Sequence, residues 1–357
     1  DVIHCNDYQT ALIPPYLKLI YNDNPAYSNI ATLYSIHNMA YQGRFPRATM
    51  ALIGLGYELF YPMSPFEYYE QVNFMKAGIV YADMLNTVSV RYAHEIQSSA
   101  EYGHGLEGIL SARSADVYGI VNGIDYDIWN PATDPLTPAH FTPIDLAGKQ
   151  ENKQVLRETF GLPDLPDDTP VIGMVSRLAS QKGFDLLTAC IDMIAGMDMQ
   201  LVILGTGAPE YHAALEQAAG LYPDKISVRL TFDNRLAHLI EAGADMFLMP
   251  SQYEPCGLNQ LYSLRYGTLP VARGTGGLVD TIRNYDETTG DGTGFMFWDY
   301  TPDAMITTIR RAIEVYHNRP AWEKMMRHAM HEDFSWQASA KKYAALYERA
   351  VEKREVE

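Results

Sequence analysis

Short apolar runs of β character recur at regular intervals through the second half of the sequence. Helical patterns lie between them, and the repeat of roughly 25 residues is typical of βαβ units and a parallel sheet. The runs are almost wholly apolar instead of alternating, as expected for strands covered on both faces. The second half therefore predicts a complete doubly wound α/β domain. Its six strand candidates are VIGMVS from Val171, LVILG from Leu201, ISVRLTF from Ile226, MFLMPS from Met246, LPVAR from Leu269 and GFMFW from Gly294.

The first half has fewer strand candidates, namely VIHC from Val2, TLYSIH from Thr32, LNTVSV from Leu85 and YGIVN from Tyr118. A second doubly wound domain normally has more strands, and its first strand-to-helix turn carries glycines. No such turn precedes these strands. We therefore expect a second Rossmann-like domain that is incomplete at its N-terminus.

A Pro-, Asp- and Thr-rich stretch at 131–170 encloses one short helical pattern and predicts a connection between domains. After Thr301 the pattern is helical to the end. We expect a partial N-terminal domain at 1–165, a C-terminal domain at 166–334 and a helical tail at 335–357.

Charge and composition exclude several classes of function. The formal net charge of −17 argues against nucleic-acid partners and against docking on anionic membranes. No apolar run reaches the ~18 residues that a membrane-spanning helix needs. Three cysteines far apart in sequence (Cys5, Cys190 and Cys256) form neither a disulfide framework nor a zinc pattern, which favours a reducing compartment.

Two cations follow the first strand of the second half, in SRLASQKG from Ser176. Arg177 and Lys182 would lie at the carboxyl end of that strand, where open α/β sheets bind ligands, and they suit a diphosphate. The alternative is two unrelated surface cations. LGTG, which contains Gly205, is weak support for a phosphate loop.

Two further stretches place chemistry at the same sheet edge. In RGTGGLVDT from Arg273, backbone N–H groups of Gly276 and Gly277 would face a phosphate; the alternative is a tight strand-to-helix turn. In PSQYEPCGLNQLYSLRYG from Pro250, Glu254 comes directly after a strand and could stabilise positive charge or merely cap a helix. Cys256 is interpreted as a small packed residue and not as a nucleophile.

Polar residues also follow the strands of the first half. Asp7, His37 and Asn122 each come at or just after the end of a predicted strand. Any one of them alone is more simply a structural residue. Because the carboxyl ends of parallel strands meet at one edge, their convergence predicts a site.

These stretches together resemble the bacterial glycogen synthase and plant starch synthase family. The resemblance rests on DVIHCNDYQTALIPPYLK, SIHNMAYQGRFP, YGHGLEGIL, VNGIDYDIWNPATD, VSRLASQKGFDLL, PSQYEPCGLNQLYSLRYGTLPV and RGTGGLVDT. It implies a GT-B fold, in which two Rossmann-like doubly wound domains face a cleft. The N-terminal, acceptor-side domain would be incomplete here, the C-terminal domain would bind the nucleotide sugar, and the last helix would return to the N-terminal domain.

The resemblance also implies roles for individual residues. Arg177 and Lys182 would neutralise the departing diphosphate, Glu254 would lie beside the transferred glucose, and His37 would lie at the sugar. Asp7 and Asn122 would contact glucose or the acceptor. The remaining donor-binding residues would be Gly205, Tyr253, Cys256, Gly257, Leu258, Thr275, Gly276 and Gly277, with the TFDNRLAH segment near the base.

The function implied is transfer of glucose from ADP-glucose to the non-reducing end of an α-1,4-glucan with retention, by phosphate-assisted front-face attack. Tyr262, where many related enzymes carry a second Glu, favours this family. No cofactor and no metal are expected, and the location would be a bacterial cytoplasm or a plastid stroma. ADP- against UDP-glucose and the oligomeric state stay open.

Two alternatives to this function stay open, and the first rests on a departure from the family. The Lys-x-Gly-Gly-Leu loop that the family uses at the donor phosphates does not occur in this sequence. A non-catalytic glucan-binding or regulatory fragment is therefore one alternative. A GT-B phosphorylase with lysine-bound pyridoxal phosphate is the other.

Overall fold

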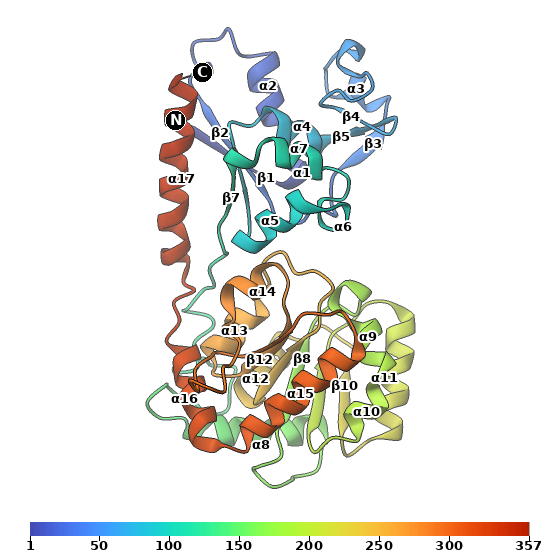
Figure 1. The fold of residues 1–357 in the computed structure, drawn as a ribbon, viewed down its shortest axis with the longest axis vertical. Coiled ribbons are helices and arrows are strands. Elements are labelled where there is room, and N and C mark those ends of the chain that lie inside the picture. The colour runs from blue at the N-terminus through green and yellow to red at the C-terminus, as the bar shows by residue number, and fades with distance from the viewer. Residues whose placement is uncertain (357) are drawn as a thin grey trace. The chain divides into compact units, whose positions relative to one another are not determined.

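The computed structural model describes residues 1–356, which form two compact units (Figure 1). Of the described residues, the first unit comprises 1–122 and 337–356, and the second comprises 123–336. The expected boundary at 165 is therefore displaced, because the segment 123–165 packs with the second unit. Its helix α8 (Ala147–Phe160) contributes Leu156 and Phe160 to a hydrophobic cluster with Val202 and Leu239 of that unit.

The second unit is built on a six-stranded parallel sheet with the order β10-β9-β8-β11-β12-β13. All six predicted strands are confirmed. The chain runs outward from β8 through β9 to β10, then returns to the other side of β8 with β11. Open α/β sheets bind ligands where the strand order reverses in this way, which here is between β8 and β11. The strands are β8 (Val171–Val175), β9 (Gln200–Leu204), β10 (Ile226–Arg229), β11 (Met246–Met249), β12 (Leu269–Arg273) and β13 (Phe295–Phe297).

Helices cover both faces of this sheet, and alternate strand residues enter two separate clusters. Ile172 and Leu248 point into one cluster, and Val171 and Phe247 into the other. The helical segment after β8 is interrupted at Cys190, whose backbone leaves the helical region of φ/ψ space. The helices are α9 (Phe184–Ala189), α10 (Ile191–Ala195), α11 (Pro209–Leu221), α12 (Asn234–Gly243), α13 (Asn259–Arg265), α14 (Gly276–Thr281), α15 (Pro302–Tyr316) and α16 (Arg319–Met330).

The first unit holds a four-stranded parallel sheet with the order β1-β2-β6-β7, which confirms the four predicted strands. The long helix α17 (Trp336–Val356) covers one face, where Leu346 and Ala350 pack on Leu33 and Met84. A small antiparallel sheet of three strands, which the sequence pattern does not indicate, lies apart from it. The strands are β1 (Val2–Asn6), β2 (Ala31–Ile36), β3 (Arg44–Pro46), β4 (Glu67–Tyr68), β5 (Gln71–Asn73), β6 (Met84–Thr87) and β7 (Val117–Gly119).

The opposite face of the four-stranded sheet and the loops carry the remaining helices of this unit. Ile79 and Ile96 are buried there against Tyr34 and Leu85. The α-helices are α1 (Asp7–Thr10), α2 (Ile13–Leu19), α3 (Thr49–Leu52), α4 (Phe74–Tyr81), α5 (Val90–Ser98), α6 (Ala100–Gly103) and α7 (Glu107–Ala112).

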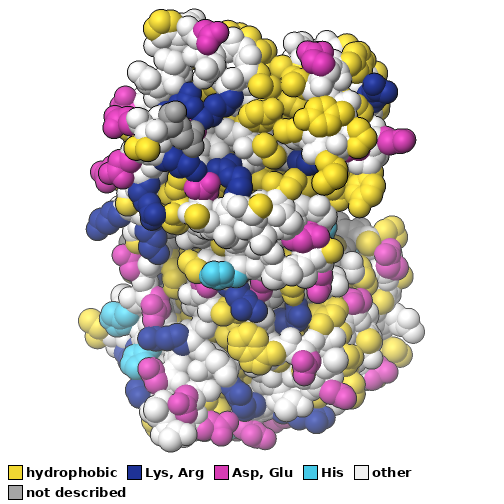
Figure 2. Space-filling model, turned by 45° about the horizontal axis from the view of Figure 1, so that its top comes forward, with side chains coloured by type: hydrophobic (Ala, Val, Ile, Leu, Met, Phe, Trp, Pro, Cys, Tyr) yellow, Lys and Arg dark blue, Asp and Glu magenta, His cyan; other side chains and the backbone are white. Residues whose placement is uncertain are grey.

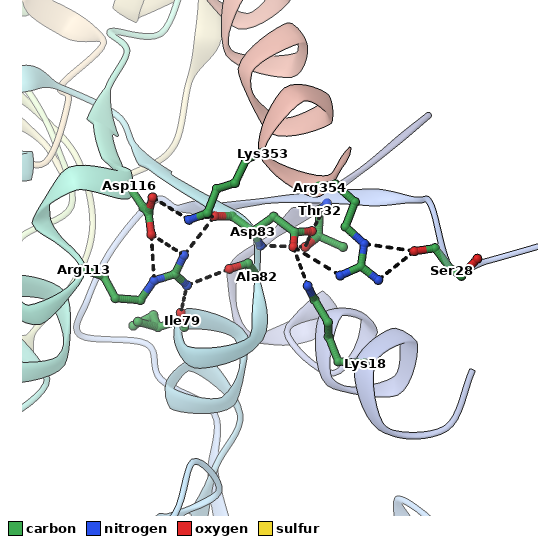
Figure 3. A network of polar contacts seen from close by, with 10 residues as sticks. All are labelled: Lys18, Ser28, Thr32, Ile79, Ala82, Asp83, Arg113, Asp116, Lys353 and Arg354. Atoms are coloured by element: carbon green, nitrogen blue, oxygen red, sulfur yellow. Dashed lines mark hydrogen bonds and ion pairs between the residues drawn. The ribbon is translucent and has the colours of Figure 1, made fainter. Parts of the chain in front are cut away.

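A polar network fastens the end of α17 to the sheet of the first unit (Figure 3). The buried carboxylate of Asp83 accepts hydrogen bonds from the backbone N–H and the hydroxyl of Thr32, each at 2.7 Å, and lies 3.9 Å from Arg354 of α17. Lys353 donates to the Asp83 carbonyl at 3.0 Å and pairs with Asp116 at 2.6 Å. Asp83 and Thr32 stand where strands begin, so the network lies at the edge opposite the carboxyl ends of the strands.

The surface carries charge of both signs and a gathering of hydrophobic side chains. Figure 2 shows that gathering at the upper right of the view, over the region of α3 and the small antiparallel sheet. Tyr61, Met63 and Tyr69 are exposed large hydrophobic residues of that segment.

Among the described residues, no helix combines the length and the apolar character that a bilayer crossing needs.

Candidate functional site

The two predicted cations lie at the point where the strand order reverses. Arg177 and Lys182 occupy the loop after β8, and Arg177 is exposed and donates to the Gln181 side chain at 3.4 Å. The loop is fixed against the end of β11, because Gln252 donates its backbone N–H to the Gln181 carbonyl at 2.9 Å. Gly183 permits this approach: its φ is +80°, and a Cβ there would lie 2.1 Å from the Pro250 carbonyl oxygen.

Glu254 and Lys182 meet directly. The Lys182 ammonium lies 2.6 Å from Glu254 Oε2, which also accepts a hydrogen bond from the Ser251 hydroxyl at 3.0 Å. The Lys182 side chain is 20% exposed and the Glu254 side chain 7% exposed. An ion pair so far out of water holds its geometry better than a surface pair. A cation and a carboxylate are thus held at one sheet edge.

The glycines after β12 pack closely against the backbone of the Glu254 loop. A Cβ on Gly276 would lie 1.9 Å from the Glu254 carbonyl oxygen, and one on Gly277 would lie 2.1 Å from the Cys256 carbonyl oxygen. The Gly277 N–H donates to the carbonyls of Glu254 and Pro255 at 3.0 and 3.1 Å. The expectation that this N–H faces a phosphate is therefore wrong in this structure. The alternative, a tight strand-to-helix turn, is what the structure has at Gly277.

A pocket of about 300 Å³ opens beside the same edge. Its walls come from the carboxyl ends of β8 and β9, including Arg177 and Gly205, and from the segment Thr231–Asn234. Trp129, Asn259 and Tyr262 complete it. The pocket thus joins Arg177 to the TFDNRLAH segment, and its size is in the range of small-molecule sites.

The other predicted donor residues lie around the Glu254 loop. Cys256 is buried, Leu258 is 40% exposed, and Gly257 has a φ of +70°. The Tyr253 carbonyl accepts a hydrogen bond from Gln181 at 3.5 Å, and Thr275 is buried at the start of α14. None of these five residues lines the pocket.

Sequence reasoning missed Trp129 and Asn259 as parts of the pocket. Trp129 lies in the segment that the sequence assigned to the N-terminal domain, just before the predicted connection. Asn259 stands one position beyond the predicted donor residues, and its side-chain amide donates to the Val175 carbonyl at 2.5 Å. The only sequence feature that could have pointed to Asn259 is its position shortly after Glu254.

The first unit brings three of its predicted residues to the carboxyl edge of its own sheet. Asp7 follows β1 with a φ of +53°, and its Oδ1 accepts the His37 backbone N–H at 2.8 Å. His37 follows β2, and its Nε2 lies 2.9 Å from Asn6 Oδ1. Asn122 follows β7 and is half-buried. The Asp7 carboxylate therefore positions the His37 backbone, while the imidazole is held by Asn6. The left-handed backbone at Asp7 is the kind of strain that persists at functional sites.

The described residues contain no group of three or more His, Cys, Asp or Glu side chains arranged to hold a metal ion. An Asp-x-Asp stretch, the pattern of many diphosphate-metal anchors, does occur at Asp125–Asp127. There the Asp125 carboxylate accepts the backbone N–H of Asp127 at 2.8 Å and closes a turn. All three cysteines are buried and none forms a disulfide.

Two Rossmann-like sheets, one of them with cations and a carboxylate at its switch point, form the GT-B fold of glycosyltransferases. Residues 1–112 match the family model described as starch synthase catalytic domain, and residues 157–329 match glycosyl transferases group 1. The chain belongs to the glycogen synthase and starch synthase family and is a glucosyltransferase of glycogen or starch synthesis.

The similarity extends over almost the whole chain. Glycogen synthase of Koribacter versatilis is 49% identical and that of Moorella thermoacetica 50% identical, each over 99% of this chain and 72% of the relative. The catalytic domain of starch synthase IV from Arabidopsis thaliana, solved with ADP and acarbose bound, superposes with a TM-score of 0.91 at 36% identity, over 99% of this chain and 73% of the other. A sucrose-phosphate synthase from Thermosynechococcus elongatus, at 18% identity and a TM-score of 0.60, shares the fold.

Proposed function

We propose that this chain transfers glucose from ADP-glucose to the non-reducing end of an α-1,4-glucan, with retention of anomeric configuration. The observation that carries the proposal is the pairing of Lys182 with Glu254 beside Arg177 at the switch point of the second unit. The similar starch synthase IV structure holds ADP and acarbose, a nucleotide and a glucan-like oligosaccharide, which supports both substrate classes.

The donor diphosphate would be bound by Arg177 and Lys182. Arg177 is exposed, and its fork of N–H groups suits bidentate contact with phosphate oxygens, whereas Lys182 supplies a point charge. The nucleoside would occupy the pocket that Arg177 shares with the Thr231–Asn234 segment. The positive charges would do here what a divalent ion does in metal-dependent transferases, so we propose binding without metal.

In the reaction, the bond between glucose C1 and the β-phosphate oxygen breaks and the electron pair leaves with the diphosphate. Arg177 and Lys182 stabilise that developing charge, which is the largest change in charge during the step. The acceptor 4-hydroxyl attacks C1 from the face that the diphosphate leaves, and its proton passes to the departing phosphate oxygen. Glu254 stabilises the positive charge on the sugar ring. No second carboxylate at the spacing of a double-displacement pair is invoked.

The first unit would supply contacts to glucose and to the acceptor. Asp7, His37 and Asn122 stand on the carboxyl edge of one parallel sheet, and their amide, imidazole and carboxylate groups suit sugar hydroxyls. Asp7 would act chiefly by holding the backbone of His37, because its Oδ1 is engaged there at 2.8 Å. We assign His37 the position nearest to the transferred sugar.

The test separates donor binding from transfer. ADP and UDP are titrated calorimetrically into the chain, and transfer of label from ADP-glucose to glycogen is measured. Lys182→Ala should weaken ADP binding at least tenfold, or by about 1.4 kcal/mol. Lys324→Ala is the charge control, since Lys324 is an exposed cation that donates to the Gly290 carbonyl.

Each outcome has a distinct meaning. ADP binding that depends on Lys182, together with incorporation of label, supports the proposal. ADP binding without incorporation, at glycogen concentrations that saturate the chain, would instead identify a glucan-binding module without turnover. Equal ADP affinity of the Lys182 and Lys324 variants would overturn the assignment of the site.

A further inference from the structure

We propose that Asp134 and His238 are positioning residues for the nucleotide pocket. They hold the indole of Trp129 flat against Tyr262, so that these two rings form one fixed wall of the pocket. The inference rests on the proposed function, because it takes the pocket beside Arg177 to be the donor nucleotide site. Neither residue would touch the donor or the reacting atoms.

Three rings form a stack. The Trp129 ring lies 3.8 Å from His238 with an interplanar angle of 11°, and 3.8 Å from Tyr262 with an angle of 14°. Two nearly parallel rings at that distance cannot share one face of the indole, so His238 and Tyr262 lie on opposite faces. Trp129 and Tyr262 line the pocket, whereas His238 is only 1% exposed. His238 therefore packs on the face of Trp129 that Tyr262 does not cover, and it is itself buried.

Asp134 fixes the imidazole. Its Oδ2 lies 2.7 Å from His238 Nδ1 and accepts the Tyr266 hydroxyl at 2.5 Å, while its Oδ1 accepts the Leu136 N–H at 2.9 Å. Asp134 is itself 1% exposed. Burial would raise the pKa of Asp134, but the hydrogen bonds from His238 and Tyr266 outweigh burial and lower that pKa. The carboxylate is thus a fixed acceptor that sets the plane of the imidazole.

The second imidazole nitrogen argues against a purely structural role for His238. Among the described residues, His238 Nε2 is a fully buried polar atom without a hydrogen-bond partner. A core that needed only to be filled would more simply place an apolar residue there, because an unpaired buried polar atom is costly. What the imidazole supplies is a flat ring held in one orientation, and the ring it orients lines the pocket.

The helix that carries His238 also contributes residues that line the pocket. His238 belongs to α12, and Asn234 and Ala237 of that helix line the pocket directly. The helix begins at Asn234 and is capped by Asp233, whose side chain accepts the Leu236 N–H at 3.0 Å. Loss of the ring at 238 would free one face of Trp129 without removing any pocket-lining side chain. We therefore expect the affinity for nucleotide to fall even though every lining residue stays in place.

The experiment compares His238→Ala with His238→Phe. The alanine variant removes the ring, and the phenylalanine variant restores a flat ring without the bond to Asp134. We expect His238→Ala to weaken ADP binding about tenfold and His238→Phe to weaken it by about threefold, because phenylalanine keeps a flat ring that Asp134 no longer orients. Tyr266→Phe is the control, because it removes a hydrogen bond to Asp134 and leaves the stack intact; its ADP affinity should not change.

A second readout follows Trp129 itself. Acrylamide quenching of tryptophan emission, taken as the difference between the parent chain and Trp129→Phe, should show Trp129 more accessible in His238→Ala and less affected in His238→Phe. This measurement needs no nucleotide. If the parent chain does not bind ADP, the proposed function fails, while the quenching still decides whether His238 holds Trp129.

Two results would overturn the inference. One is a folded His238→Ala variant with the ADP affinity and the Trp129 quenching of the parent chain. The other is a His238→Phe variant as weak as His238→Ala, since a flat ring would then not be what matters. If His238→Ala does not fold, Trp129→Leu takes its place. Unchanged ADP affinity in that variant would contradict the proposal that the Trp129 ring forms a wall of the nucleotide pocket.

Discussion

The ammonium of Lys182 lies 2.6 Å from the carboxylate of Glu254, although the two residues follow different strands and are far apart in sequence. Strands β8 and β11 are neighbours in the sheet, so the loops after them meet. Replacing Glu254 by Gln should reduce transfer by at least 100-fold, because the charge that faces the sugar is lost. ADP affinity should change much less, which single-turnover kinetics and calorimetry would resolve. Equal losses in both would assign Glu254 to binding alone.

Gly276 should not tolerate a side chain. A Cβ there would collide with the Glu254 carbonyl oxygen, and its φ of +45° is unfavourable for other residues. Gly276→Ala should lower the free energy of unfolding by about 2 kcal/mol or more and abolish transfer. Gly220→Ala is the control, because a Cβ at Gly220 of α11 meets nothing within 4 Å and the change should be neutral or stabilising by up to ~1 kcal/mol. Thermal unfolding of the two variants would contradict this if Gly276→Ala were the more stable.

The network at the end of α17 should make stability sensitive to acid. Burial alone would raise the pKa of Asp116, but hydrogen bonds from Lys353 and Arg113 outweigh it and lower that pKa. A lowered pKa in the folded state gives stability that is present above the unfolded value of about 3.9 and is lost as the pH falls through the folded value. Lys353→Met should therefore flatten the dependence of Tm on pH below about 5. An unchanged slope would show that the Lys353 pair does not contribute to it.

The cysteines should be inert in the folded chain. All three are buried, and burial raises the pKa of Cys5 to about 12 and that of Cys190 to about 11. Because the thiolate is the reactive form, iodoacetamide at pH 8 should modify these two thiols rapidly only after denaturation. Intact-mass measurement before and after guanidinium gives the answer. Cys256→Ala should retain transfer within about tenfold, and complete loss would make the thiol a working part of the site.

Donor binding should not need a divalent ion. Arg177 and Lys182 supply positive charge for the diphosphate, so EDTA should leave the Kd for ADP within about twofold. Titration after dialysis against chelator, with Mg²⁺ restored in a parallel sample, makes the comparison. A tenfold recovery on adding Mg²⁺ would contradict the proposal.

The sequence predicted the strands of the second unit well because most of them are almost wholly apolar runs, and the runs from Val171 to Phe297 are all strands of one sheet. It missed the small sheet of β3, β4 and β5, since strands of two or three residues have no periodicity to recognise. The boundary was misplaced because a Pro-rich segment resembles a linker even when it packs. Asp134, within that segment, is buried against His238 and Tyr266 of the second unit.

The sequence indicated the charged residues of the candidate site, but the residues that pack around them are brought together only by tertiary contacts. Arg177, Lys182 and Glu254 follow strands directly, so a strand assignment places them. The stacking of Trp129 on Tyr262 joins distant segments, and no local pattern reports it. The Gly277 N–H was assigned to a phosphate because a glycine pair is compatible with both a phosphate loop and a tight turn, and only the neighbouring carbonyls distinguish the two.

The reversal of strand order at β8 also has a consequence for the order of folding. β8, β9 and β10 are consecutive in the chain and can assemble as a local unit, but β11 must return across β8 before Lys182 can meet Glu254. Gly183 packs on Pro250 at the same junction, so the loop after β8 has its packing partner only once the end of β11 is in place. The diphosphate site would therefore form late in refolding. The rate at which ADP binding recovers would then report the pairing of β8 with β11.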